Sequence, residues 1–204
     1  MATNLDEQHV RLTFSNAWSA VKWDAPASDP PPHPYRDGIE HLKGELDGAS
    51  ESTKAVDVVA VSPAGCLYLI ELKDFRTDYA AGGVPRALAF GTRWKDLPLE
   101  VALKVRDTLA GVCGVLQRDS PATIAEWIKP ALGKPVRVVA LIAQTRRASE
   151  TAAKRTIRND ELLKNLRRKL AWLTENRRHV LMLDPSASQS FPTDLDGLSA
   201  ASLP

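Results

Sequence analysis

Two short apolar runs carry the strongest structural signal of this chain. They are Lys54-Ala-Val-Asp-Val-Val-Ala-Val61 and Cys66-Leu-Tyr-Leu-Ile-Glu-Leu-Lys73, joined by Ser62-Pro-Ala-Gly65. Both runs are rich in β-branched or aliphatic residues, are bounded by Pro and Gly, and lack the 3.6-residue period of an amphipathic helix, which favours two buried strands. The short turn between them predicts a hairpin. Such a hairpin would bring Asp57 close to the Glu71 end of the neighbouring strand.

The charged residues of these runs have an informative spacing. Glu71 and Lys73 are two residues apart, so in a strand their side chains share one face and Leu72 points to the other. Asp57 lies inside an apolar run, where aspartate is uncommon, and a buried carboxylate costs free energy unless it is paired or bound to metal. Two carboxylates and an amine at one place can hold a hard cation and activate water. The alternative is a solvated Glu71–Lys73 pair, with Asp57 a charge at the strand edge.

The order of these residues resembles the PD-(D/E)XK nuclease superfamily, which has the restriction-endonuclease-like fold. The superfamily pattern is an acid on one strand, a variable spacer, and (Asp/Glu)-x-Lys on the next strand. Here it reads Asp57, thirteen residues (58–70), then Glu71-Leu72-Lys73, with Val56 where the pattern has proline. The resemblance covers roughly residues 34–143 and is one of pattern rather than of close sequence.

This resemblance implies a fold of the α/β class, with a mixed central sheet flanked by helices and an αβββαβ core. It also implies a nuclease that hydrolyses phosphodiester bonds in nucleic acid, with DNA the expected substrate, through water activated by Mg²⁺ or Mn²⁺. Asp57, Glu71 and the main-chain carbonyl of Leu72 would then hold the metal. Lys73 would position or activate the attacking water.

Superfamily members often add a metal-binding glutamate from the helix that precedes the two strands. Residues 35–47 have the period of such a helix. Glu40 is preferred because it lies at the more usual distance upstream of Asp57, whereas Glu45 lies nearer the apolar face of the helix and stays a candidate. Asp24 is a third candidate. For each of these acids the alternative is a surface position.

Basic side chains after the motif are candidate nucleic-acid contacts. Superfamily members often place one on the following helix, where it meets the scissile phosphate. Lys104 and Arg106 lie on opposite sides of the apolar stripe of a helix expected over 99–117, so one of them can face the site; the alternative is that both are solvated. Arg93 and Lys95 fall in the loop expected before that helix, among aromatic residues that could stack on bases or, as the alternative, anchor the loop to the core.

Positive charge is concentrated in residues 146–178, which contain eleven Lys and Arg against four acids, although the whole chain has a net charge of only +2. Such a region is typical of proteins that bind a phosphate backbone. Arg146 and Arg147 begin the region and are candidate nucleic-acid contacts. A solvated helix face is the alternative.

The length of 204 residues suggests one domain. We expect a nuclease-like domain over 1–184 and a Ser- and Pro-rich tail over 185–204 that is loosely ordered or docked. Because no apolar run is long enough to span a bilayer and the N-terminus lacks a signal peptide pattern, a cytoplasmic protein without a membrane partner is expected. The expected partners are nucleic acid and either a second copy of the chain or a helicase or ATPase.

The remaining pattern predicts strands over 9–14, 135–143 and 179–184 and a helix over 159–175. Ser15 can cap a short segment over 16–23. The proline-rich residues 25–34 must form a loop, since proline supplies no ladder donor.

Two other functions fit the same residues. A catalytically inactive nuclease-fold module for binding nucleic acid or another protein would show salt-sensitive binding without cleavage. A structural or assembly protein with incidental charges at its strand ends would not be stabilised by divalent metal.

Overall fold

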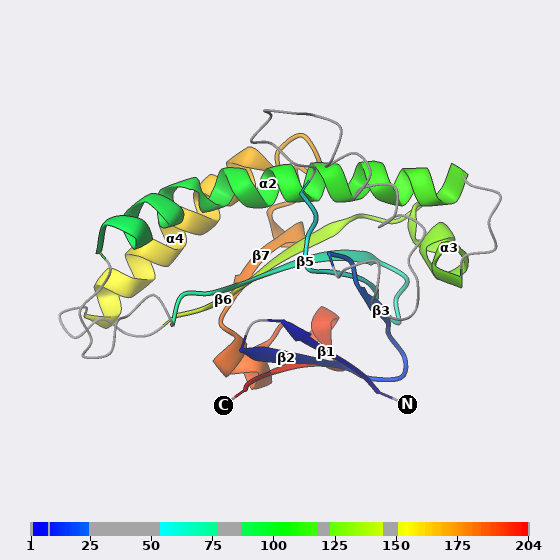
Figure 1. Ribbon diagram of the computed structural model, residues 1–204, viewed down its shortest axis with the longest axis horizontal. Coiled ribbons are helices and arrows are strands. Elements are labelled where there is room, and N and C mark those ends of the chain that lie inside the picture. The colour runs from blue at the N-terminus through cyan, green and yellow to red at the C-terminus, as the bar shows by residue number, and fades with distance from the viewer. Residues whose placement is uncertain are drawn as a thin grey trace.

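The computed structural model describes residues 2–7, 9–24, 54–76, 87–117, 123–144 and 151–203. It has a mixed α/β fold in three layers: helices, a central five-stranded sheet and a smaller three-stranded sheet (Figure 1). The strands are β1 (Thr3–Glu7), β2 (Val10–Phe14), β3 (Ser19–Lys22), β4 (Val58–Val61), β5 (Leu67–Asp74), β6 (Arg137–Ala143), β7 (Val180–Leu183) and β8 (Leu198–Ser202). The helices are α2 (Ala87–Gln117), α3 (Thr123–Ile128) and α4 (Ala152–Lys169), with 3-10 turns η1 (Lys129–Ala131), η2 (Arg177–His179), η3 (Pro185–Ser190) and η4 (Thr193–Leu195).

The hairpin expected from the two apolar runs is confirmed. β4 and β5 pair antiparallel, with Val58 opposite Ile70 and Val61 opposite Leu67. The turn is closed by a hydrogen bond of 2.7 Å from the Gly65 N–H to the Ser62 carbonyl. Gly65 adopts φ 74°, a left-handed conformation that favours glycine.

The central sheet has the order β3-β4-β5-β6-β7 and is mixed. β3, β4 and β5 are antiparallel neighbours, whereas β5–β6 and β6–β7 are parallel. Parallel neighbours need long crossovers, which here contain α2 and α4. Both faces of the parallel strands are covered, which explains why β6 reads as an almost continuous apolar run.

Alternate residues of the central strands enter two separate cores. Val59 and Leu69 face the helices and pack with Val101 and Val105 of α2. Their neighbours on the opposite face, including Ile70, pack with β2, β8 and Trp18 under the three-stranded sheet. This period of two fixes which β5 side chains can meet α2.

Several element boundaries differ from the sequence-based expectation. Arg93 and Lys95, expected in a loop, belong to α2, which begins at Ala87 rather than after Pro98. Proline in a helix interior normally costs about 3 kcal/mol, but Leu97 and Val101 on either side are buried in the core and keep the helix continuous.

Three other elements also differ from the sequence-based expectation. The helix expected over 159–175 is α4, which runs from Ala152, capped by the Thr151 side chain, to Lys169. The short segment expected over 16–23 contains the edge strand β3. β1 was not expected, because its alternation of half-buried and exposed residues is weak in apolar side chains.

Residues 185–204, expected to be loosely ordered or docked, contain β8, which pairs with β2 in the order β1-β2-β8. The Trp18 indole N–H donates to the Asp196 carbonyl at 2.8 Å, and the Tyr68 hydroxyl donates to the Asp194 carbonyl at 3.1 Å. Leu195 and Leu198 are buried in the core beneath the small sheet. The described part of this segment is therefore packed onto the central sheet.

Some expected features lie outside the described residues: the proline-rich loop, the helix over 35–47 with Glu40 and Glu45, and both Arg146 and Arg147. Among the helices that the structure describes, none is long and apolar enough to cross a membrane.

Candidate functional site

The candidate site lies at the open end of the β4–β5 hairpin. Asp57 is the residue before β4, and the register of the hairpin places it opposite Glu71. Both side chains belong to the face of the sheet that α2 covers, and Asp57 and Glu71 are only 4% and 1% exposed. The hairpin therefore brings two buried carboxylates to one place.

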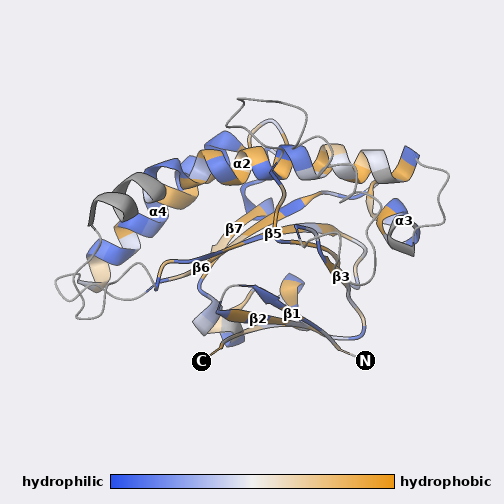
Figure 2. Cartoon of the chain, in the orientation of Figure 1, coloured by the Kyte–Doolittle hydropathy of each residue, from blue (hydrophilic) through white to orange (hydrophobic). Residues whose placement is uncertain are grey.

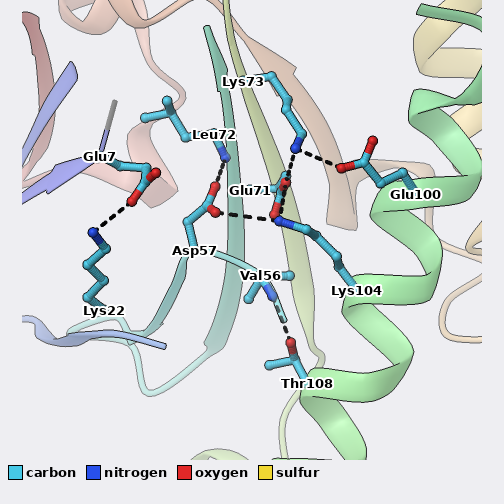
Figure 3. Close-up of polar contacts among 10 residues, drawn as sticks. All are labelled: Glu7, Lys22, Val56, Asp57, Glu71, Leu72, Lys73, Glu100, Lys104 and Thr108. Atoms are coloured by element: carbon cyan, nitrogen blue, oxygen red, sulfur yellow. Dashed lines mark hydrogen bonds and ion pairs between the residues drawn. The ribbon is translucent and has the colours of Figure 1, made fainter. Parts of the chain in front are cut away.

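Three elements hold Asp57 in position. Its Oδ2 accepts a hydrogen bond from the Leu72 N–H, and its main-chain carbonyl accepts one from the Trp23 N–H at 2.8 Å. The preceding Val56 N–H donates to Thr108 Oγ1 of α2 at 2.9 Å (Figure 3). The residue that follows β3, the strand β5 and the helix α2 thus fix the segment that carries the carboxylate.

Two lysines converge on one oxygen of Glu71. Lys73 Nζ, from the same strand, lies 3.0 Å from Glu71 Oε1, and Lys104 Nζ, from α2, lies 2.8 Å from the same atom (Figure 3). Lys104 Nζ also lies 3.6 Å from Asp57 Oδ1. Lys73 makes a second ion pair, 2.7 Å long, with Glu100 Oε1. The other oxygen of Glu71, Oε2, is buried without a hydrogen-bond partner among the described residues.

Burial and charge shift the ionisation of these groups. Burial, followed by the charge of Asp57, raises the pKa of Glu71 to about 7, although both lysines oppose the shift. Burial likewise raises the pKa of Asp57 against the opposing effect of Lys104. Burial alone would lower the pKa of Lys73, but the carboxylates of Glu71 and Glu100 outweigh it and raise the pKa. The site therefore favours protonated lysines and a Glu71 that titrates near neutral pH.

A second group of acids adjoins the first. Carboxylate oxygens of Glu7, Asp24 and Asp57 lie within 4.8 Å of one another. Glu7 comes from β1 and pairs with Lys22 at 2.9 Å. Asp24, the third candidate for the additional acid, therefore lies beside Asp57. Glu7 was missed, and no local signal could have found it, because it belongs to a strand of the other sheet.

The two basic candidates on α2 have different surroundings. Lys104 reaches the carboxylates, whereas the Arg106 side chain is 63% exposed and pairs with its neighbour Asp107 at 2.8 Å. Glu100 was also missed, although its position one turn before Lys104 could have suggested a shared face.

The remaining candidates lie elsewhere or are not described. Lys95 is exposed on α2, and Arg93 lies in the first turns of the same helix. Leu72 has its side chain in the core under the small sheet and contributes its N–H to Asp57. Glu40, Arg146 and Arg147 lie outside the described residues.

The donor set fits a hard divalent cation. Glu7, Asp24, Asp57, Glu71 and Glu100 supply five carboxyl groups against the three ammonium groups of Lys22, Lys73 and Lys104. The group carries two negative charges once all five are ionised, and for Glu71, with a pKa of about 7, this requires neutral or higher pH. Carboxylate oxygens with water are the ligands that Mg²⁺ prefers, and Glu71 Oε2 is a buried oxygen that needs a partner. Asp57 and Glu71 are the residues that would hold such an ion.

Comparison with protein-family models, curated proteins and solved structures finds no match. The chemistry of the site must therefore be inferred from its own geometry. Opposed buried carboxylates beside two fixed ammonium groups can bind a cation on one side and a phosphate oxygen on the other.

Proposed function

We propose that this protein is a Mg²⁺- or Mn²⁺-dependent nuclease of the PD-(D/E)XK type that hydrolyses phosphodiester bonds in nucleic acid, with DNA as the expected substrate. The observation that carries the proposal is the meeting of Asp57, Glu71, Lys73 and Lys104 in one buried cluster at the open end of the hairpin. Charged side chains without a functional role at the end of a hairpin would be solvated. Here the carboxylates are buried and one of their oxygens has no partner among the described residues.

Each residue of the cluster would have its own role in hydrolysis. A divalent ion bound by Asp57 and Glu71 would supply a Lewis acid and lower the pKa of its water. Lys73, held between Glu71 and Glu100, keeps its proton and so would position the attacking water or a phosphate oxygen as an ammonium donor. Lys104 would offer positive charge to the phosphate from the helix side.

The order of elements around the site supports the same proposal. The segment β4-β5-α2-β6, with β5 and β6 parallel, has the order of the last four elements of the αβββαβ core. Asp57 directly precedes β4 and Glu71 lies on β5, an arrangement consistent with the two neighbouring strands of the superfamily pattern. A second copy of the chain, or a helicase or ATPase, remains the proposed protein partner.

A cleavage assay tests the proposal. End-labelled single-stranded DNA, double-stranded DNA and RNA are incubated with Mg²⁺ or Mn²⁺ and with wild type, Lys73→Ala or Glu71→Gln. We expect metal-dependent cleavage that falls at least about a hundredfold in both variants. Lys129→Ala and Glu126→Gln, changes of the same type at exposed positions, are the matched controls. Cleavage that persists in Lys73→Ala and Glu71→Gln would exclude this site as its source.

One observation favours a second function, a catalytically inactive nuclease-fold module that binds nucleic acid or a protein. The cluster is partly satisfied without metal, because Lys73 and Lys104 pair with Glu71 and the Leu72 N–H pairs with Asp57. Such a module would bind DNA in a salt-sensitive manner. It would cleave none of the three substrates, and Asp57→Ala would leave its binding intact.

A further inference from the structure

A second charged feature lies at the C-terminal end of α4. A cavity of about 560 Å³, which we call the α4 cavity, is formed by the last turns of α4, the turn that follows and the start of β7. Its lining includes four cationic side chains, Lys164, Arg167, Arg168 and Arg177. It shares no residue with the candidate nuclease site. In Figure 2 much of the α4 ribbon has the colour of hydrophilic residues.

The positive charge of this cavity is not neutralised by ion pairs. Within the residues that the structure describes, Lys164, Arg168 and Arg177 make no salt bridge. Arg167 donates to a carbonyl, that of Val180, through two bonds of 3.3 Å. Two acids, Asp160 and Glu175, also line the cavity, so four cations against two anions leave two positive charges.

Desolvation, and then the charge of Arg177, lower the pKa of Arg167. The second of these effects is the one expected where two cations lie close together. An anion in the cavity would relieve that repulsion.

The wall that carries Arg177 is braced by a small polar network. The ring nitrogens of His179 lie 3.0 Å from Thr174 Oγ1 and 3.2 Å from Asn176 Nδ2. Asn176 Oδ1 in turn accepts from the Arg178 N–H at 3.0 Å. The turn is therefore shaped before a ligand binds, which reduces the ordering cost of binding.

The size and surroundings of the cavity indicate its ligand. A volume of about 560 Å³ lies within the range of small-molecule sites and suits a nucleotide unit. Trp172 does not line the cavity, but it follows the lining residue Ala171 directly and is 56% exposed. An exposed indole next in the chain to the cavity lining offers a face on which a base of a bound strand can stack.

We propose that the α4 cavity binds the phosphate backbone of single-stranded nucleic acid, with Trp172 stacking on a base. The proposal rests on the proposed function in taking nucleic acid as the ligand, but it requires no cleavage. The cavity reaches Val180, which pairs with Val138 at the start of β6, whereas Lys73 pairs with Ile142 near the end of that strand. The α4 cavity would therefore hold a part of the strand that is not being cut.

Fluorescence anisotropy of a labelled single-stranded oligodeoxynucleotide, measured in EDTA, tests the proposal. Arg168→Ala/Arg177→Ala removes two exposed cations, and Lys129→Ala/Lys154→Ala removes two exposed cations from elsewhere as the matched control. We expect the first double variant to bind about tenfold or more weakly and to reduce the slope of log affinity against log salt by about 1.4. We expect Trp172→Ala to weaken binding at least about fivefold. Thermal melts establish that all variants are folded.

Equal affinity of the two double variants would overturn the proposal. Heparin serves as a ligand with negative charge but no bases. If Arg168→Ala/Arg177→Ala loses as much affinity for heparin as for the oligonucleotide, and Trp172→Ala has no effect, nucleic acid would be overturned as the ligand. The cleavage assay with Mn²⁺ on single-stranded DNA, double-stranded DNA and RNA separates the two proposals. If none of the three is cleaved while the anisotropy differences are as expected, the nuclease is excluded and the α4 cavity is kept. If cleavage occurs while the two double variants bind equally well, the α4 cavity is overturned and the nuclease is kept.

Discussion

Lys104 of α2 places its ammonium 2.8 Å from Glu71 Oε1 of β5, in a position where both side chains are shielded from solvent. This ion pair joins the helix layer to the open end of the hairpin. Breaking a buried ion pair by removing one partner leaves an uncompensated charge, which is more costly than the pair itself is favourable. The pair is therefore expected to control both the stability of the fold and the ionisation of the site.

Removal of the Lys104 charge should destabilise the protein. We expect Lys104→Met to lower the free energy of unfolding by about 3 kcal/mol at pH 8, since it leaves buried Glu71 with only Lys73 as a partner. The loss should shrink at pH 5, where Glu71 can take up a proton. Urea denaturation at both pH values measures it, and Arg106→Met, on the exposed side of the same helix, should change stability by less than about 0.5 kcal/mol. A similar loss in both variants would contradict the role of the pair.

The pKa of Glu71, raised by burial from 4.5 to about 7, predicts a pH dependence of stability. Between these pH values the folded protein binds a proton that the unfolded chain has released. Stability should therefore fall as the pH rises through this range, by at most about 3 kcal/mol from this group. The measurement is the difference between wild type and Glu71→Gln in chemical denaturation from pH 4 to 8 in EDTA. A difference that does not change with pH would show that Glu71 titrates near its unfolded value.

Divalent metal should stabilise the folded protein through Asp57 and Glu71. At a Mg²⁺ or Mn²⁺ concentration ten times the dissociation constant, we expect the melting temperature to rise by about 3–6 °C. The rise should be larger at pH 8 than at pH 6, because Glu71 must lose its proton to bind the ion. Asp57→Asn should abolish the shift, while Asp160→Asn, a neutralisation at an exposed position on α4, should leave it unchanged. A shift that survives Asp57→Asn would place the metal elsewhere.

Thr108 should matter for the site although it lies outside the ion pairs. Its hydroxyl oxygen accepts from the buried Val56 N–H at 2.9 Å, next to Asp57. We expect Thr108→Val to cost about 1–3 kcal/mol, because the N–H is left without an acceptor, and to weaken the metal-induced thermal shift. Thr156→Val, which alters an exposed threonine on α4, is the control for hydroxyl loss. Unchanged stability and metal response in Thr108→Val would show that this hydrogen bond does not position Asp57.

The part of the site that could be predicted from the sequence is the part made by neighbouring segments. A short turn and a period of two place Asp57 opposite Glu71 and give Glu71 and Lys73 one face. The period of the helix predicted that Lys104 or Arg106 would face the carboxylates. Only the packing of α2 on the sheet decides that Lys104 does so.

Contacts between distant segments could not be predicted in this way. Glu7 of β1 and Asp24, two residues after β3, reach Asp57 from other parts of the chain, and local pattern carries no information about which sheets pack together. The same limit applies to β8, whose segment reads as loosely ordered by composition but is held by ladder hydrogen bonds to β2. Backbone pairing depends little on residue type, so composition alone underestimates it.

The three-stranded sheet joins the two most distant parts of the described chain, with Val10 opposite Ser202. Closing so large a loop carries a high entropic cost and delays pairing until much of the fold already exists. The β4–β5 hairpin, in contrast, closes locally and early. We therefore expect Asp57 and Glu71 to be opposed before β8 completes the three-stranded sheet, so that the strand ends that carry the site form ahead of the layer that covers the other face of the central sheet.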